Sequence, residues 1–180
     1  NDKKKIAGVF YFERQLYSFF PRIEEPLIAK IKLKWLYEEV KNLNRKNYIF
    51  IDFDELDKHS IQLTKLINIF DEIVDSVNNG DGKGLYNLFK SFNESFNQML
   101  KNCNVKFITS SLFQMIYFFY INDIDNKNIL DYAHKEFIKL NNLDIFEYTF
   151  LNLFFKNKKK RITKLNYMYN LFKNYILQCL

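Results

Sequence analysis

Three carboxylates lie within one short stretch of the chain, "FDEIVDS" (Phe70–Ser76). Asp71 and Asp75 are four residues apart, so on a helix both side chains project from one face. Such hard oxygen ligands suit magnesium, which bridges to substrate phosphates and stabilises a departing diphosphate. This chemistry needs a second carboxylate cluster, for which Asp123 and Asp125 in "NDIDN" are the candidates. We favour the alternative of a solvated acidic helix end, because two carboxylates at this spacing are common on helices.

A second chemical feature is a run of positive charge, "FFKNKKKRITK", between two expected helices. RNA, an acidic lipid surface or an acidic protein surface would suit such a run. The stretch contains no known nucleic-acid motif, and a solvated basic loop is the favoured alternative. The side chains of this basic run are Lys156, Lys158, Lys159, Lys160, Arg161 and Lys164.

Other kinds of site are poorly represented. Cys103 and Cys179 are too few for a disulfide framework, and a reducing compartment fits them. His59 and His134 are isolated in sequence, which argues against a zinc site, and His134 is expected on a helix surface. No glycine-rich phosphate loop and no Ser/His/Asp or Cys/His arrangement is present. We therefore expect no catalytic residue, no cofactor and no small-molecule substrate.

The composition predicts an all-α protein. Hydrophobic residues make up 48% of the 180 residues and aromatic residues 18%, with only 4 Gly and 2 Pro. This is too apolar for a disordered chain and too poor in glycine for most β sandwiches and nucleotide-binding folds. One helical domain over residues 1–180 is expected. The net charge of +6 is a mild excess. The abundance of Asn and of aromatic residues is typical of an AT-rich genome and is given no functional weight.

Apolar residues recur at three- and four-residue spacing through most of the chain. Pro21 is expected to end the first helix, Ser60 to cap the third, and Asn78–Gly82 to form the clearest turn. Residues 48–56 are interpreted as a short helix rather than an isolated strand, and residues 107–121 as a buried helix too short for a membrane span. The main helices are expected at residues 6–20, 23–44, 60–77, 83–103, 107–121, 129–142, 143–155 and 164–180.

The second of these helices has a predicted apolar face. Leu27, Ile31, Trp35 and Val40 can share it, with the lysines and Glu38 elsewhere on the helix.

The stretch "GVFYFERQLYSFFPRIEEPLIAKIKLKWLYEEV" (Gly8–Val40) resembles the opening helices of the squalene/phytoene synthase family. It is most similar to the branch that includes a mitochondrial complex I assembly factor, where the pattern reads xVxEPxxGxIRLQWW. The corresponding residues here are Ile23, Glu25, Pro26, Ala29, Ile31, Lys32, Leu33, Lys34 and Trp35.

Later segments agree in order with the same family. "LINIFDEIVDSV" resembles its IDxRExDL helix, and "YNLFKSFNESFNQML" resembles its LExYxxxTxSSLLxL helix. Ser111 and Gln114 in "SLFQ" stand where the family has GxAQ. The resemblance runs in register over about two-thirds of the chain and implies a shortened bundle of the isoprenoid-synthase type.

The same register removes both metal-binding boxes of the synthases. Arg14 matches the arginine before the first box, but the box itself is replaced by Tyr17, Ser18, Phe19, Phe20 and Pro21. The Arg-Asp pair of the second box becomes Tyr120 and Ile121, and only Asp125 survives. Phenyl rings and a proline offer no anionic oxygen to magnesium, so "DEIVD" resembles the first box by coincidence.

The resemblance thus implies a pseudoenzyme whose former cavity is filled by aromatic rings. Its expected role is as an accessory subunit or assembly factor of a mitochondrial respiratory membrane complex, through protein–protein contacts. The expected location is the matrix or the periphery of the inner membrane, with anionic lipid as a further partner. Two alternatives stay open. One is a magnesium-dependent prenyl-diphosphate synthase, or a lipid-binding relative, that uses Asp71, Asp75, Asp123 and Asp125. The other is an RNA- or ribosome-associated protein that uses the basic run.

Overall fold

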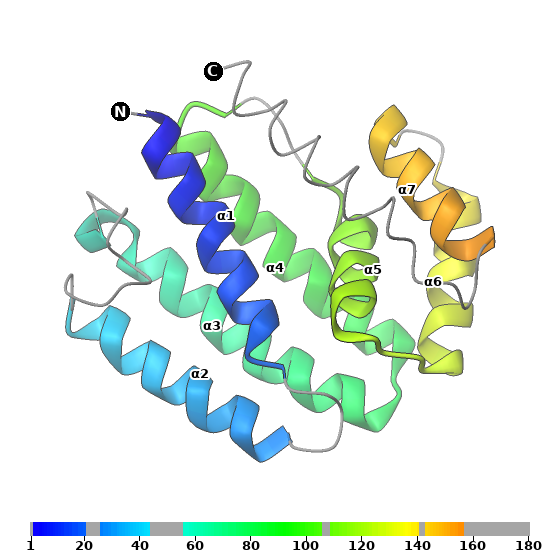
Figure 1. The fold of residues 1–180 in the computed structure, drawn as a ribbon, viewed down its shortest axis with the longest axis horizontal. Helices are drawn as coiled ribbons and strands as arrows, with labels where there is room; N and C mark the ends of the chain where they lie inside the picture. The colour runs from blue at the N-terminus through cyan, green and yellow to red at the C-terminus, as the bar shows by residue number, and fades with distance from the viewer. Residues whose placement is uncertain (1, 21–25, 44–55, 106–108, 141–142, 157–180) are drawn as a thin grey trace.

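The computed structural model of the chain describes residues 2–20, 26–43, 56–105, 109–140 and 143–156. Within these ranges all of the regular secondary structure is helical (Figure 1), which confirms the predicted all-α class. The helices are α1 (Asp2–Ser18), α2 (Pro26–Lys41), α3 (Leu56–Asn79), α4 (Gly82–Asn102), α5 (Ser111–Asn122), α6 (Lys127–Lys139) and α7 (Ile145–Lys156).

Helix α4 is the central element of the bundle. It packs against α3 along one side, against α5 and α6 along the other, and it also contacts α1 (Figure 1). Helix α2 packs on the far side of α3 and forms an edge of the molecule, while α7 packs on α5. Side chains from all seven of these helices join one cluster of buried apolar residues. The described part of the chain is therefore built around a single core.

Helix α1 crosses the bundle and is buried on most of its surface. Its apolar side chains include Ile6, Phe12 and Leu16, each of which is almost completely buried. The helix ends two residues earlier than expected, in a tight turn where the Phe19 amide donates to the Gln15 and Leu16 carbonyls at 3.1 Å each. The prediction that Pro21 ends this helix concerns a residue outside the described ranges.

The turn predicted between α3 and α4 is confirmed. Gly80 has a φ of 71°, a conformation that glycine adopts without a side-chain penalty. Asp81 then caps α4 by accepting a hydrogen bond from the Gly84 amide at 3.0 Å. The helix predicted at residues 83–103 also ends close to its expected end, because α4 stops at Asn102 and Asn104 has a φ of 61°.

Ser60 does not cap α3, so this prediction is wrong. The helix begins at Leu56, one turn earlier, and Ser60 lies inside it, where its carbonyl accepts from the Thr64 hydroxyl at 2.9 Å. A serine before apolar residues at helical spacing is a typical helix start. This pattern does not show whether the residues before the serine are helical too.

Helix α5 is the buried helix expected from its apolar sequence, although it is shorter than predicted. Ser110 caps it by accepting from the Phe113 amide at 3.2 Å, and Asp123 ends it with a φ of 56°. Leu112, Met115 and Ile116 are completely buried in the core. None of the described helices combines the length and the apolar character that a membrane-spanning segment requires.

Two other predicted helices, at residues 48–56 and 164–180, lie outside the described residues apart from Leu56, where α3 begins.

The apolar face predicted for α2 is wrong. The buried row is Ala29, Leu33, Leu36 and Val40, whose spacing of four, three and four residues follows one side of the helix and faces α3. Leu27, Ile31 and Trp35 lie about 200° around the helix from this row and are exposed. Since α2 is apolar on two opposite sides, periodicity alone did not identify the side that packs.

We expect Gly82→Ala to destabilise the protein, because Gly82 holds α4 close to α6. A Cβ at this position would lie 2.8 Å from the Tyr132 Cβ and 3.2 Å from the Ile129 Cα. Overpacking of this kind costs about 1–3 kcal/mol of unfolding free energy, which urea denaturation measures. Ser91→Ala, at an exposed position of α4, is the control. Equal stability of the two variants would contradict the close approach.

Candidate functional site

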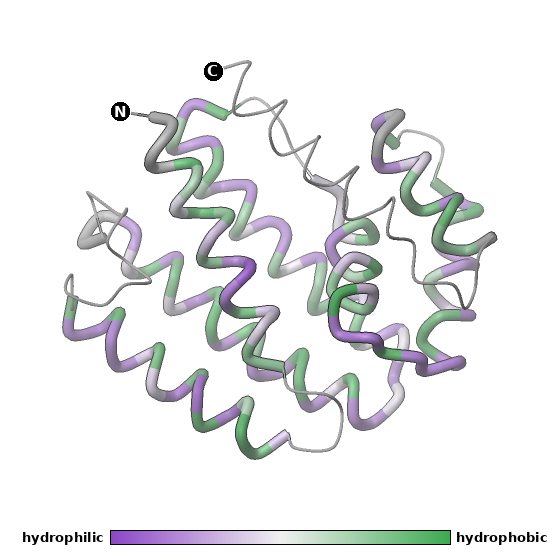
Figure 2. Tube along the Cα trace, viewed as in Figure 1, coloured by the Kyte–Doolittle hydropathy of each residue, from purple (hydrophilic) through white to green (hydrophobic). Residues whose placement is uncertain are grey.

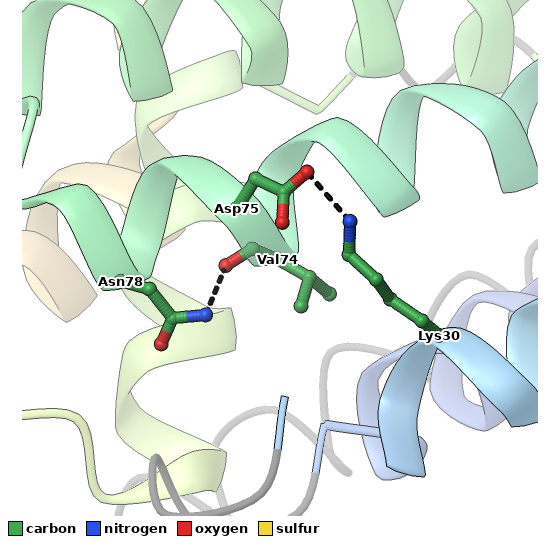
Figure 3. Close-up of polar contacts among 4 residues, drawn as sticks. All are labelled: Lys30, Val74, Asp75 and Asn78. Carbon is green, nitrogen blue, oxygen red and sulfur yellow. Dashed lines mark hydrogen bonds and ion pairs between the residues drawn. The ribbon is translucent and has the colours of Figure 1, made fainter. Parts of the chain in front are cut away.

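In the acidic stretch at the end of α3, Asp75 forms an ion pair with Lys30 of α2. The Lys30 Nζ of α2 lies 2.7 Å from the Asp75 Oδ2, and this hydrogen bond raises the pKa of Lys30 (Figure 3). Both side chains are partly exposed, so the pair adds little stability. Its main consequence is local: Asp75 points toward α2 and its charge is already compensated.

The four carboxylates proposed as an alternative magnesium site do not form one in this structure. Asp71 is half-buried on α3 near Lys30, whereas Asp123 and Asp125 are exposed in the connection between α5 and α6. Among the described residues, which include all four, no group of three or more His, Cys, Asp or Glu side chains is placed to hold a metal ion.

The basic run begins at Lys156, the last residue of α7. Its other members, Lys158, Lys159, Lys160, Arg161 and Lys164, lie outside the described residues. The RNA alternative therefore gains no geometric argument.

The histidines and the described cysteine have packing roles. The His134 ring is half-buried, with its centroid 4.7 Å from that of Phe155, rather than free on a helix surface. His59 is buried in α3, and Cys103 is a buried cysteine just after α4. None of the three belongs to a cluster of metal-ligating groups among the described residues.

The positions that the predicted resemblance aligns with the first synthase box pack into an aromatic cluster. Tyr17 is completely buried, with its ring centroid 5.3 Å from Phe118, 5.7 Å from Phe70 and 6.1 Å from Phe92. Phe20 meets Phe118 edge to face at 5.3 Å. Contacts of this kind each add about 0.5–1.5 kcal/mol beyond the burial of the rings. Helices α1, α3, α4 and α5 thus meet around Phe118.

The two residues that the predicted resemblance aligns with the Arg-Asp pair of the second box also pack against apolar groups. Tyr120 packs edge to face on Phe150 of α7 at 6.2 Å, and Ile121 is a half-buried member of the core margin. Neither side chain supplies a carboxylate.

A group of buried polar side chains lies beside this aromatic cluster. The Asn93 Nδ2 of α4 donates to the Gln114 Oε1 at 2.9 Å, to the Thr109 carbonyl at 2.8 Å and to the Thr109 hydroxyl at 3.0 Å. The Gln114 Nε2 donates in turn to the Glu13 Oε1 at 2.9 Å. One chain of hydrogen bonds therefore joins α4, the start of α5 and α1.

Two further side chains complete this group, which we call the polar core cluster: Glu13, Tyr17, Asn93, Asn97, Thr109 and Gln114. The Tyr17 hydroxyl donates to the Glu13 Oε1 at 3.0 Å. The Asn97 Nδ2 donates to the Asn93 Oδ1 at 2.9 Å and to the Thr109 carbonyl at 3.1 Å, while its own Oδ1 accepts from the Thr109 amide at 3.3 Å. Every member is less than a tenth exposed, so its polar atoms must be paired mainly within the protein rather than with water.

A second buried carboxylate, Glu147 of α7, lies at the start of α5. Its Oε1 accepts from the Ser110 amide at 2.7 Å, which places a negative charge at the N-terminal end of a helix. Burial raises the pKa of Glu147, and the hydrogen bonds from Ser110 offset only part of that effect. Since Ser110 is also the cap of α5, this carboxylate joins α7 to the helix start.

The polar core cluster was not predicted from the sequence, because Asn was discounted as a compositional bias. A signal was present. Asn93 and Asn97 are four residues apart and share the phase of Phe89 and Phe96 on the apolar side of α4. A polar residue in the apolar phase of an amphipathic helix marks a buried polar group. The sequence marks Gln114 only through its place in the resemblance to the synthase family.

Compared with known proteins, the chain matches no protein family, no curated protein and no solved structure. The resemblance to the squalene/phytoene synthase family therefore stays a prediction.

We expect Asn93→Ala to be strongly destabilising. The substitution removes the amide that donates to Thr109 and Gln114, so the buried Gln114 Oε1 and the Thr109 hydroxyl oxygen lose this donor. We expect a cost of about 3 kcal/mol of unfolding free energy. Asn87→Ala, at an exposed site of the same helix, should change stability by no more than about 0.5 kcal/mol. Chemical denaturation of both variants is the test. A loss for Asn93→Ala as small as that of the control would show that the cluster is not structural.

Glu147 should make stability depend on pH. Its folded pKa is above its ordinary value of 4.5, so the folded chain holds the proton more tightly than the unfolded chain. The unfolding free energy should therefore fall as pH rises from about 4.5 through the folded pKa, and this part of the decline should vanish in Glu147→Gln.

Glu147→Ala should lower stability throughout this range by about 1–3 kcal/mol, because the Ser110 amide loses its acceptor. Denaturation at a series of pH values compares the three proteins. Identical pH profiles for the wild type and Glu147→Gln would contradict the account.

Proposed function

We propose that this chain is a non-catalytic helical protein that acts through protein–protein contacts, as an accessory subunit or an assembly factor of a larger membrane complex. The resemblance described above points to the mitochondrial respiratory chain and to the matrix or the periphery of the inner membrane. The proposed fold type is a shortened bundle of the isoprenoid-synthase kind.

The observation that carries this proposal is the aromatic cluster around Phe118. In the register of the resemblance, Tyr17 and Phe20 stand where a synthase needs carboxylates for magnesium, and both are buried against Phe118. A buried ring gives no anionic oxygen and fills volume that a prenyl chain would need. The Tyr17 hydroxyl is directed to Glu13 and so belongs to the polar core cluster.

The surface supports the same function. Helix α2 is an edge helix with an exposed row of large apolar side chains, Leu27, Ile31 and Trp35, on the side opposite the core. Isolated exposed apolar residues are ordinary, but a continuous row along an edge helix is typical of a surface that contacts a partner. Such a row on an edge helix supports a role in binding.

Co-purification tests the proposal. A sequence for a C-terminal tag is added to the gene at its chromosomal locus. Mitochondria from the source cells are extracted with mild detergent, and the extract is treated with nuclease before the tagged chain is captured. We expect respiratory-complex subunits at near-stoichiometric amounts in the mass-spectrometric analysis, resistant to nuclease and to moderate salt. Recovery of the chain alone would overturn the proposal. Recovery with ribosomal proteins that nuclease or salt releases would favour the RNA alternative.

A further inference from the structure

The side of α2 that faces away from α3 carries an exposed row of apolar side chains. Leu27, Ile31 and Trp35 are 69%, 60% and 41% exposed and follow one another at four-residue intervals. In Figure 2, hydrophobic segments alternate with hydrophilic ones along this edge helix, as expected for a helix with apolar residues on two sides. The outer apolar row runs for two turns and has no packing partner of its own among the described helices.

The charges beside this row are mostly positive on one side. Lys30, Lys34 and Lys41 are separated by four and seven residues, so they follow the same edge of the row, with Glu38 between the last two. Lys30 is paired with Asp75. Lys34 and Lys41 have no ion-pair partner among the described residues, so two positive charges remain available to an incoming group.

We propose that the outer face of α2 is a docking surface for an amphipathic helix of a partner protein, in which an apolar stripe is bordered by carboxylates. This rests on the proposed function, since it names the kind of partner through which the chain acts. The partner's apolar side chains would cover Leu27, Ile31 and Trp35, and its carboxylates would face Lys34 and Lys41. Helix-on-helix recognition of this kind takes its affinity from apolar anchors and its selectivity from the bordering charges.

The same charges disfavour two other occupants. In an antiparallel pair of α2 helices centred on Ile31, Lys30 of one copy would approach Lys34 of the other, so like charges would oppose self-association. A flat anionic membrane would also meet Glu38, which lies between Lys34 and Lys41, whereas the carboxylates of a partner helix can be spaced to face the two lysines alone.

Trp35 makes the proposal directly measurable, because it is the only tryptophan of the chain. The purified full-length protein is titrated with a synthetic helical peptide that carries a leucine stripe bordered by glutamates. The matched peptide has lysines in place of the glutamates. We expect a blue shift of the Trp35 emission with the glutamate peptide and at least about tenfold weaker binding of the lysine peptide. Lys34→Glu should reverse this preference.

Two exposed apolar positions give matched variants. Leu27→Glu should weaken binding of the glutamate peptide about tenfold. Ile138→Glu on α6, where the residue is also 69% exposed, should leave the dissociation constant of this peptide within about twofold of the wild-type value. Circular dichroism checks that both variants keep their helices.

Three outcomes would overturn the docking proposal. They are a blue shift with phosphatidylserine vesicles but not with the peptide, a shift that depends only on protein concentration, and no shift at all. If one of these were found while the tagged chain still co-purified with its complex, the docking surface alone would be wrong. If the tagged wild-type chain did not co-purify with a complex, the proposed function itself would be wrong.

Discussion

The structure depends on the rule that a polar group taken out of water must be hydrogen-bonded. Asn93 is the clearest case, since one amide group in the centre of an apolar bundle serves both Thr109 and Gln114. Gln114 passes the connection on to Glu13 of α1. Because these bonds are made only when α1, α4 and α5 are in one relative position, they select a single packing among the many that a Phe-rich core permits.

The aromatic cluster supplies the complementary part of the stability. Large rings around Phe118 remove much apolar surface from water, but they tolerate several arrangements of similar energy. Tyr17 belongs to both groups: its ring packs on Phe118 and Phe70, and its hydroxyl donates to Glu13. The polar cluster thus fixes the geometry in which the rings pack.

Much of the fold could be predicted from the sequence, since local signals set it. The Gly80 turn and the break at Asn102–Asn104 are encoded by backbone preferences that need no distant contact. The rest depends on tertiary packing. Ser60 resembled a cap, but the helix continues before it, and α2 has two apolar sides of which only contact with α3 identifies the buried one. The polar core cluster joins residues up to 101 positions apart, a relation that periodicity does not contain.

We propose that aromatic side chains fill the space a prenyl chain would need and that the protein acts through its surface. This proposal is tested most directly by thermal unfolding of the purified chain with magnesium and a prenyl diphosphate, against magnesium with inorganic diphosphate. A ligand at about one hundred times its dissociation constant stabilises a folded protein by about 2.7 kcal/mol, which raises the unfolding midpoint by several degrees. We expect the same midpoint in both solutions. A midpoint that rises only with the prenyl chain present would contradict the proposal.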